Sequence, residues 1–245
     1  MWFRTQHYPL PRRELEWLEK ASQYSLKSES AELAIYSWGE GPVVLLVHGW
    51  SGRAVQLGAF AQPLVDAGFR VVAFDAPAHG RSPGKKTNVF RIIEAMKLVV
   101  DDTGPVHAII CHSFGAVVTA RALATGLSAN KVVCICPPAH TDYLIESFCQ
   151  TLKVPEATQA LFVKKIEHRF GDDVRSLIAT EFNARVLTIP ALIIHDKNDK
   201  EVPWQQGERL ANAWAGSRLQ LTEGLGHRRI LRNKEVVNMA VDFIR

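Results

Sequence analysis

The sequence contains no apolar run of about 18 residues, the length at which a helix begins to span a lipid bilayer. Its first residues also lack the apolar core of about 7–15 residues that marks a secretory signal peptide. Only four of the 245 residues are cysteines, and no two of them form a Cys-x-x-Cys pair. These absences argue against a membrane protein, a disulfide framework and a cysteine-ligated zinc site. We therefore expect a cytoplasmic protein with reduced thiols.

Charge of one sign is not concentrated anywhere in the chain. The formal net charge is +4, 22% of the residues are charged, and the basic residues are dispersed rather than gathered in blocks. This pattern gives little support to nucleic-acid binding, so we expect neither nucleic acid nor a membrane as a partner. A chain of 245 residues is the usual size of one large α/β domain.

Short apolar runs recur along the chain and alternate with helical patterns. The runs cover residues 43–47, 70–74, 108–111, 131–136, 191–195 and 219–221, and residues 31–38 are typical of an edge strand. Strands that alternate with helices predict an α/β fold, with a mostly parallel central sheet and helices on both faces. Functional sites in such sheets gather beyond the carboxyl ends of the strands.

Two segments depart from this alternation. Residues 1–30 are polar and basic, with one amphipathic helix expected at Glu14–Tyr24, and we interpret them as an N-terminal surface extension without a chemical role. Residues 139–185 have the pattern of several short helices without strands, which predicts a small helical cap inserted into the domain. Residues 1–138 and 186–245 then form the core. Within the core, a helix is expected at Ala54–Ala67.

The segment 106–120, VHAIICHSFGAVVTA, joins a buried strand to a buried helix through an abrupt turn at Ser113. A serine at such a turn presents its hydroxyl beyond the sheet edge, and small residues are needed two positions before and after it. Gly115 meets the second requirement, and Cys111 stands where a glycine is usual. The alternative is a serine that only caps a core helix.

A serine nucleophile needs a base that is itself oriented by an acid. Asp199 lies a few residues after the apolar run 191–195, and His227 follows the run 219–221 beside two glycines. The order Ser113, Asp199, His227 is that of α/β-hydrolase triads. Three other acids that follow strands are rivals for the role of Asp199, namely Asp75, Asp142 and Asp196.

Acyl transfer also needs two N–H donors for the oxyanion that develops on the carbonyl. One is the backbone N–H of the residue after the nucleophile, Phe114. The other is expected from the loop after the early central strand, where His48 and Gly49 precede Trp50. We expect Trp50 and Phe114 to form the oxyanion hole.

These motifs together resemble those of serine hydrolases of the α/β-hydrolase fold superfamily, from about residue 31 to the C-terminus. The resemblance rests on HGWSG at 48–52, DAPAHGRS at 75–82, CHSFG at 111–115, HDKNDKEVP at 195–203 and GLGH at 224–227. PLPRRELEW and GLGHRRIL also resemble a group of bacterial hydrolases of this superfamily. The resemblance implies that Ser113 is the nucleophile, Asp199 the acid and His227 the base. It also implies that residues 139–185 shape the substrate pocket, and Ser113 excludes an aspartate nucleophile.

Several other residues are candidates for secondary roles. His48, His112, Tyr143 and Phe148 are possible pocket residues, although His48 and His79 are more typical of histidines that hold loops. No paired metal-ligand spacing is present, so neither a metal nor another cofactor is expected. The three arginines after His227 predict either a solvated helix start or recognition of an anionic substrate; they are Arg228, Arg229 and Arg232.

The function expected from the sequence is a carboxylesterase-like serine hydrolase that cleaves an ester or thioester of a small-molecule acyl substrate through an acyl-enzyme. Two alternatives stay open. One is a relative without catalysis that binds a ligand or partner, which the departure at Cys111 motivates. The other is a cofactor-free haloperoxidase-like enzyme, since the same three residues support that chemistry.

Overall fold

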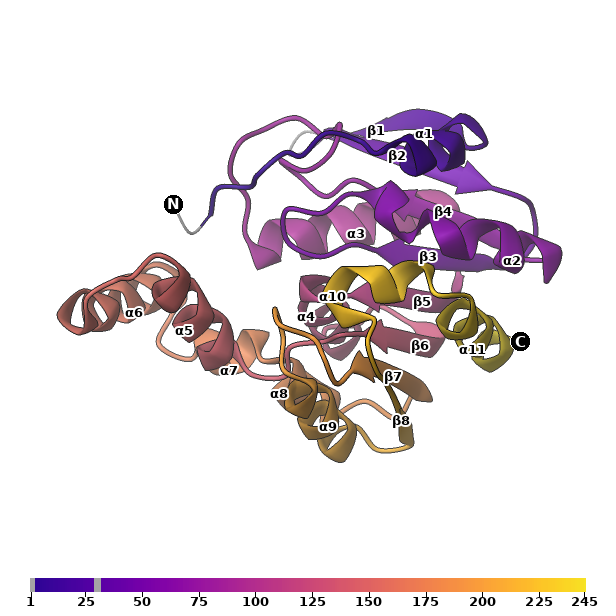
Figure 1. Cartoon of the computed structure of the whole chain (residues 1–245). Coiled ribbons are helices and arrows are strands. Elements are labelled where there is room, and N and C mark those ends of the chain that lie inside the picture. The colour runs from indigo at the N-terminus through magenta and orange to yellow at the C-terminus, as the bar shows by residue number, and fades with distance from the viewer. Residues whose placement is uncertain (1–2, 29–31) are drawn as a thin grey trace.

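One eight-stranded sheet forms the centre of the computed structural model, which describes residues 3–28 and 32–245 (Figure 1). Its strand order is β1-β2-β4-β3-β5-β6-β7-β8. The strands are β1 Ser22–Lys27, β2 Glu32–Trp38, β3 Val43–Val47, β4 Arg70–Phe74, β5 Val106–His112, β6 Ala129–Ile135, β7 Ala191–Asp196 and β8 Ser217–Thr222. The six strands from β3 to β8 run parallel, whereas β1 and β2 are antiparallel to their neighbours. This confirms the predicted α/β fold with a mostly parallel sheet.

The edge of the sheet differs from the expectation. Residues 31–38 were expected to form the edge strand, but β2 pairs with both β1 and β4 and therefore lies inside the sheet, while Ala31 lies outside the described residues. The helix expected at Glu14–Tyr24 ends at Glu19, and Ser22–Lys27 is the true edge strand. Its mostly exposed, polar side chains gave no apolar strand signal, which is why the sequence pattern missed it.

Helices cover both faces of the sheet (Figure 1). The helices are α1 Arg12–Glu19, η1 Ala54–Phe60, α2 Ala61–Asp66, α3 Val89–Thr103, α4 Phe114–Ala124, α5 Thr141–Thr151, α6 Glu156–Phe170, α7 Val174–Ile178, α8 Thr180–Ala184, α9 Trp204–Ala213, α10 Gly226–Arg229, η2 Ile230–Arg232 and α11 Lys234–Ile244. The helix expected at Ala54–Ala67 is split into the 3₁₀ helix η1 and the α-helix α2. Within the described residues, none of these helices combines the length and apolarity required to cross a membrane.

Alternate residues of the parallel strands supply two cores, one on each face. On one face, Leu45 and Ile109 pack with residues of α3, α4 and α9. On the other face, Leu46 and Ile110 pack with residues of η1, α2 and α11. A parallel strand buried on both faces needs apolar residues at every position, and β3 has the sequence VVLLV for this reason.

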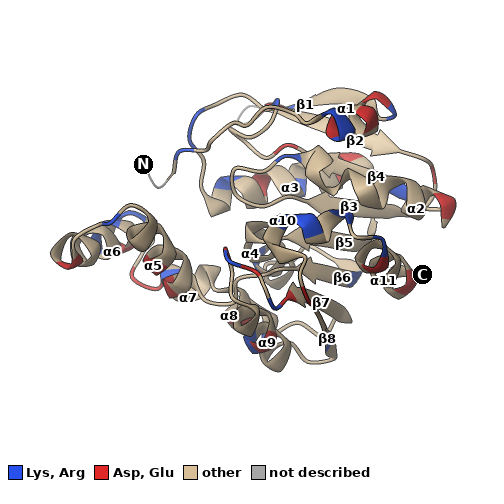
Figure 2. Cartoon of the chain, in the orientation of Figure 1, with Lys and Arg blue, Asp and Glu red and all other residues tan. Residues whose placement is uncertain are grey.

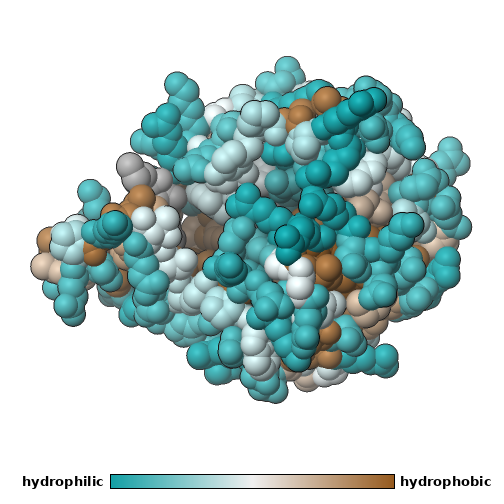
Figure 3. Space-filling model, in the orientation of Figure 1, coloured by the Kyte–Doolittle hydropathy of each residue, from teal (hydrophilic) through white to brown (hydrophobic). Residues whose placement is uncertain are grey.

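The segment 139–185, which we call the cap, contains α5 to α8 and joins β6 to β7. Helices α5 and α6 stand out from the body at the left of Figure 1. They share a small apolar cluster with α7, built on Ile145, Cys149, Ile166 and Val174. The space-filling view shows a hollow with apolar residues at its base between the cap and the body (Figure 3).

The N-terminal segment packs against loops at the carboxyl ends of the strands. The Gln6 N–H donates to the Ser51 hydroxyl over 3.0 Å, and the Thr5 hydroxyl donates to the Ala78 carbonyl. Glu14 forms a buried ion pair with Arg53 at 2.6 Å. The interpretation of residues 1–30 as a surface extension is therefore wrong for this part, because its polar side chains find partners in loops distant in sequence.

Candidate active site

Ser113 occupies a strained turn between β5 and α4. Its φ of 51° and ψ of −122° lie in a region that residues other than glycine rarely adopt. The turn is held because the Ser113 N–H donates to the Ile135 carbonyl at 2.9 Å and the Ala116 N–H donates to the Ser113 carbonyl at 2.9 Å. A Cβ on Gly115 would stand 2.4 Å from the Val47 carbonyl oxygen, so a glycine is required there.

The cysteine that replaces the usual glycine does not enter the site. Cys111 is completely buried in the core below the turn, where its Sγ lies 3.5 Å from both the Cys134 Sγ and the Val133 carbonyl oxygen. The requirement at this position is a small side chain that fits between strands, and a thiol satisfies it.

The loop after β3 passes directly against Ser113. A Cβ on Gly49 would lie 3.0 Å from the Ser113 Cβ and 3.2 Å from the His112 carbonyl oxygen. The Trp50 and Phe114 rings meet edge to face with centroids 5.3 Å apart. Phe114 is the first residue of α4, and the N–H of a first helical residue has no partner within its helix. The two residues expected to supply oxyanion donors therefore lie side by side next to Ser113.

Asp199 and His227 form a buried pair. The His227 Nδ1 lies 2.7 Å from the Asp199 Oδ2, and the Asp199 Oδ1 accepts 2.8 Å hydrogen bonds from the N–H groups of Glu201 and Val202. Burial opposes the charge of Asp199, but the hydrogen bonds from His195 and His227 outweigh it, so the pKa of Asp199 lies far below its usual value. The carboxylate is therefore ionised at neutral pH and oriented toward the imidazole.

His112 connects this pair to the serine turn. Its Nε2–H donates to the His227 carbonyl at 2.9 Å, and the two rings lie 4.6 Å apart. Ser113 and His227 line the same cavity, and no hydrogen bond joins their side chains in the part of the chain that the structure describes. Catalytic hydrogen bonds of this kind are often long before substrate binds.

The rival acids have other partners. Asp196 accepts hydrogen bonds from the backbone N–H groups of Leu225 and Gly226, at 3.0 and 2.9 Å, and so shapes the loop that carries His227. Asp75 accepts from the Ala54 and Arg81 N–H groups and the Tyr36 hydroxyl. Asp142 pairs with Arg175 at 2.9 Å. Asp199 alone among these four acids contacts His227.

His48 is a loop-holding residue rather than a pocket residue. Its Nδ1–H donates to the Gly49 carbonyl at 2.7 Å, and its Nε2 accepts from the Ala76 N–H at 3.0 Å. Burial lowers the pKa of His48 to about 4, so the ring is neutral. It does not line the cavity, and its expected place in the pocket was wrong because both ring nitrogens serve the loops.

A buried thiol and a second histidine lie beside the carboxylate of Asp199. Ligand atoms of Cys136, His195 and Asp199 lie within 4.8 Å of one another, a spacing that a metal ion accepts. Burial first, and the Asp199 charge next, raise the pKa of the Cys136 thiol well above its usual value. The His195 Nε2–H donates to the Val202 carbonyl at 2.9 Å. We interpret Cys136 and His195 as residues that hold the Asp199 carboxylate in position by hydrogen bonding.

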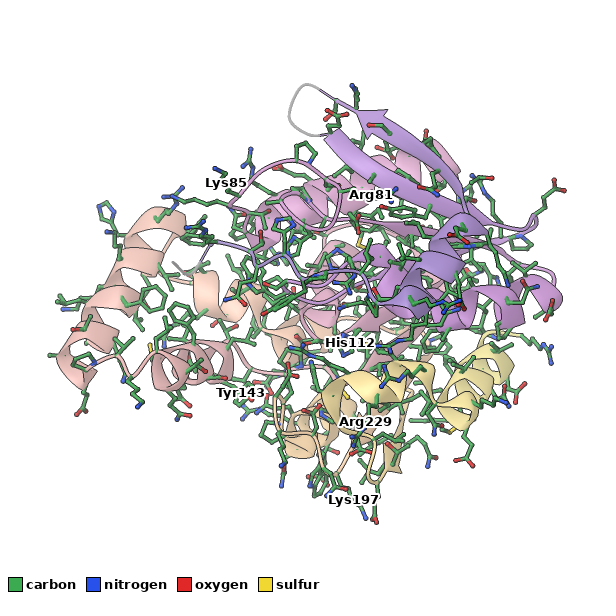
Figure 4. All side chains as sticks on the ribbon, turned by 45° about the horizontal axis from the view of Figure 1, so that its top comes forward. Arg81, Lys85, His112, Tyr143, Lys197 and Arg229 are labelled. Atoms are coloured by element: carbon green, nitrogen blue, oxygen red, sulfur yellow. The ribbon has the colours of Figure 1, made fainter. Side chains whose placement is uncertain are left out.

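A cavity of about 1830 Å³ opens over Ser113 and His227. Its lining includes Tyr143 and Phe148 of the cap and His112 at the end of β5; Figure 4 labels Tyr143 and His112. The Tyr143 hydroxyl donates to the Glu201 carbonyl and so joins the cap to the loop of Asp199. The N-terminal segment from Phe3 to Trp17 forms another wall, which sequence reasoning missed. The sequence feature that pointed to a role for this segment was the resemblance of PLPRRELEW to related hydrolases.

Comparison with known proteins matches residues 44–239 to the model of the alpha/beta hydrolase family. The chain belongs to this family. It is therefore a hydrolase by family, with the fold that the sequence motifs implied.

Among curated proteins, the chain is similar to the lysophosphatidylserine lipase ABHD12 of Danio rerio, at 26% identity over 95% of this chain and 62% of that protein. The chain thus spans less than two thirds of the length of that relative. Two similar solved structures are a bromoperoxidase from Bacillus anthracis, with a TM-score of 0.71, and the esterase EaEST from Exiguobacterium antarcticum, with a TM-score of 0.68. Each is 19% identical and covers 91% of this chain and 99% of its own, which shows a shared fold.

Proposed function

We propose that the protein hydrolyses carboxylic esters through an acyl-enzyme formed on Ser113, with His227 as the base and Asp199 as the acid. The observation that carries the proposal is the 2.7 Å contact between His227 Nδ1 and Asp199 Oδ2, on a cavity that Ser113 also lines. A carboxylate held on one imidazole nitrogen fixes the tautomer that leaves Nε2 as the acceptor. The backbone N–H groups of Glu201 and Val202 fix that carboxylate in turn.

In the first half of the reaction, the Ser113 Oγ attacks the substrate carbonyl carbon while its proton moves to the His227 Nε2. The carbonyl oxygen becomes an oxyanion, for which the N–H groups of Trp50 and Phe114 are the donors. When the tetrahedral intermediate collapses, the ester C–O bond breaks and the proton passes from His227 to the departing alcohol. The acyl group remains on Ser113.

In the second half, a water molecule repeats the attack on the acyl-enzyme. His227 takes a proton from this water, and the new oxyanion collapses with rupture of the bond to the Ser113 Oγ. The proton on His227 returns to Ser113, and the carboxylic acid leaves. Because Asp199 remains ionised throughout, it stabilises the imidazolium that forms in both halves.

The cavity supports an acyl ester as the substrate class. Its cap side is lined by apolar side chains that suit an acyl chain, among them Phe90, Phe148, Ile166 and Phe170. The similarity to a lysophosphatidylserine lipase and an esterase fits the same class.

The test is hydrolysis of p-nitrophenyl esters of graded chain length by the Ser113→Ala variant. Loss of the serine costs about 10⁶ in turnover in another triad hydrolase, so we expect activity to fall to background with the unfolding temperature nearly unchanged. Ser147→Ala is the matched control, because Ser147 lines the same cavity on the cap, and we expect it to keep activity within about threefold. Substantial turnover by Ser113→Ala would remove the proposal.

The fold shared with a bromoperoxidase supports a second candidate, cofactor-free haloperoxidase-like activity at the same site. In this chemistry, hydrogen peroxide replaces water in the second half-reaction, so the acyl-enzyme yields a peracid that oxidises a halide. Bromination of monochlorodimedone with acetate and peroxide tests it, and we expect any activity to disappear in Ser113→Ala. The alternative of a protein that binds a ligand without catalysis was suggested by Cys111 in place of a glycine. Because Cys111 fits in the core, it no longer supports that alternative.

A further inference from the structure

We propose that the end of the cavity formed by α1, α10 and η2 binds an oxyanion group, a phosphate in particular, carried by the alcohol portion of the substrate. This inference rests on the proposed ester hydrolysis and names its substrate class. The substrate would be an anionic amphiphile, with its acyl chain under the cap and its phosphate among Arg13, Arg228 and Arg232.

The cavity carries an excess of positive charge. Among the residues that the structure describes, six basic residues line it, namely Arg4, Arg13, Arg53, Lys200, Arg228 and Arg232, against two acidic residues, Glu14 and Glu201. Both acids are engaged: Glu14 pairs with Arg53 at 2.6 Å, and Glu201 pairs with Arg228 at 2.9 Å. In the described ranges 3–28 and 32–245, neither Arg13 nor Arg232 forms an ion pair.

Arg13 and Arg232 come from opposite ends of the chain and are held near each other. Arg13 is the second residue of α1, and the buried Glu14–Arg53 pair fixes α1 on the loop after β3. Arg232 ends η2, five residues after His227. Partial burial first, and then the charges of Arg13 and Arg229, lower the pKa of Arg232. Figure 2 shows basic residues both at the start of α1 and on α10.

Positive charges that lie near one another repel, and here the nearest acid, Glu14, is already paired with Arg53, so a bound anion would be stabilised between them. Guanidinium groups suit a phosphate because their planar fork donates two parallel hydrogen bonds to its oxygens. Arg229 is excluded from this role, since its side chain donates to the carbonyls of Gly224 and Leu225 at 2.8 and 3.0 Å. Arg228 lines the cavity and directly follows His227 in the sequence, and its charge is shared with Glu201 at 2.9 Å.

The two ends of the cavity therefore differ in character. The cap end is apolar, with Phe148 and Phe170, whereas the α1–η2 end is cationic. Ser113, which directly precedes α4, lines the same cavity as the residues of both ends. An ester bond placed at Ser113 would thus have its acyl chain on one side and its charged alcohol on the other.

The first experiment compares 1-lauroylglycerol 3-phosphate with 1-lauroylglycerol, which share the acyl chain and ester bond. We expect Arg13→Gln and Arg232→Gln each to raise KM for the phosphate ester by about 5- to 10-fold, with kcat and the neutral ester little changed. The effect should shrink in 0.5 M NaCl because salt screens exposed charges. Arg218→Gln is the control, since Arg218 is exposed on β8 and does not line the cavity. Equal effects on the two esters, or the same effect from Arg218→Gln, would overturn the proposal.

The second experiment separates this proposal from the proposed function. Calorimetric titration with octyl phosphate, which has no ester bond to cleave, uses the unaltered protein and the Arg13→Gln/Arg232→Gln double variant. We expect the double variant to bind at least about 30-fold more weakly, whether or not any ester is hydrolysed. Equal affinity of the two proteins would refute the anion subsite and leave Ser113 catalysis standing. Failure to hydrolyse any ester, with the affinity difference intact, would refute only the catalytic proposal.

Discussion

Replacing Asp199 by asparagine perturbs the centre of the proposed mechanism while changing almost no volume. The Asp199 Oδ1 faces two N–H donors, from Glu201 and Val202, at 2.8 Å each. The single carbonyl oxygen of an asparagine must therefore take the Oδ1 place, and its NH₂ group then faces His227 at the Oδ2 place. Two donors cannot share that 2.7 Å contact, so His227 must shift its proton from Nδ1 to Nε2.

An imidazole with its proton on Nε2 cannot accept the Ser113 proton. In a serine protease with the same arrangement, this substitution lowers kcat by about 10⁴, which corresponds to about 5.4 kcal/mol of transition-state stabilisation. We expect Asp199→Asn to lower kcat for a p-nitrophenyl ester by a similar factor, with KM changed by less than about threefold. Stopped-flow and steady-state kinetics at neutral pH measure both. Asp142→Asn, at the rival acid on the cap, should retain near-normal kcat; a variant of Asp199 that keeps a tenth of the activity would refute the reasoning.

Three further predictions concern the supports of the site. Glu14→Gln should lower the free energy of unfolding in urea by about 3 kcal/mol, because it leaves Arg53 buried without its partner; a change under about 1 kcal/mol would contradict this. Gly49→Ala should lower kcat by about 100-fold, because its Cβ would press on the Ser113 Cβ at 3.0 Å and displace the oxyanion loop; unchanged kcat would show that the loop yields freely. Burial lowers the pKa of His48, His79 and His112, so these side chains stay neutral in the folded protein while they take up protons in the unfolded chain. The free energy of unfolding should therefore fall as the pH decreases from about 6.5 toward 4, by up to about 4 kcal/mol per pH unit. Urea titrations at each pH measure this, and a flat profile would contradict it.

The parallel part of the fold was predictable because it depends on local patterns. A strand buried on both faces must be apolar at every position, so runs such as Val43–Val47 can be read directly. The turn at Ser113 was equally readable, because the close approach of Gly115 to the Val47 carbonyl leaves only glycine as an option. The same holds for the last helix, whose inward residues recur with helical spacing.

What the sequence did not show depends on contacts between distant segments. The edge strand Ser22–Lys27 is stabilised by its ladder with β2 rather than by an apolar face. The N-terminal wall of the cavity exists because Glu14 is paired with Arg53, 39 residues away. His48 looked like a pocket residue because it precedes the oxyanion loop, yet both its ring nitrogens bind backbone groups.

In the proposed mechanism, Ser113 is the activated nucleophile. Treatment of the purified protein with a fluorophosphonate, followed by intact mass and peptide mass spectrometry, tests it most directly. We expect one phosphonyl group per chain, on Ser113, and none in the Ser113→Ala or Asp199→Asn proteins on the same timescale. A protein that stays unlabelled, or that carries the label on another serine, would contradict it.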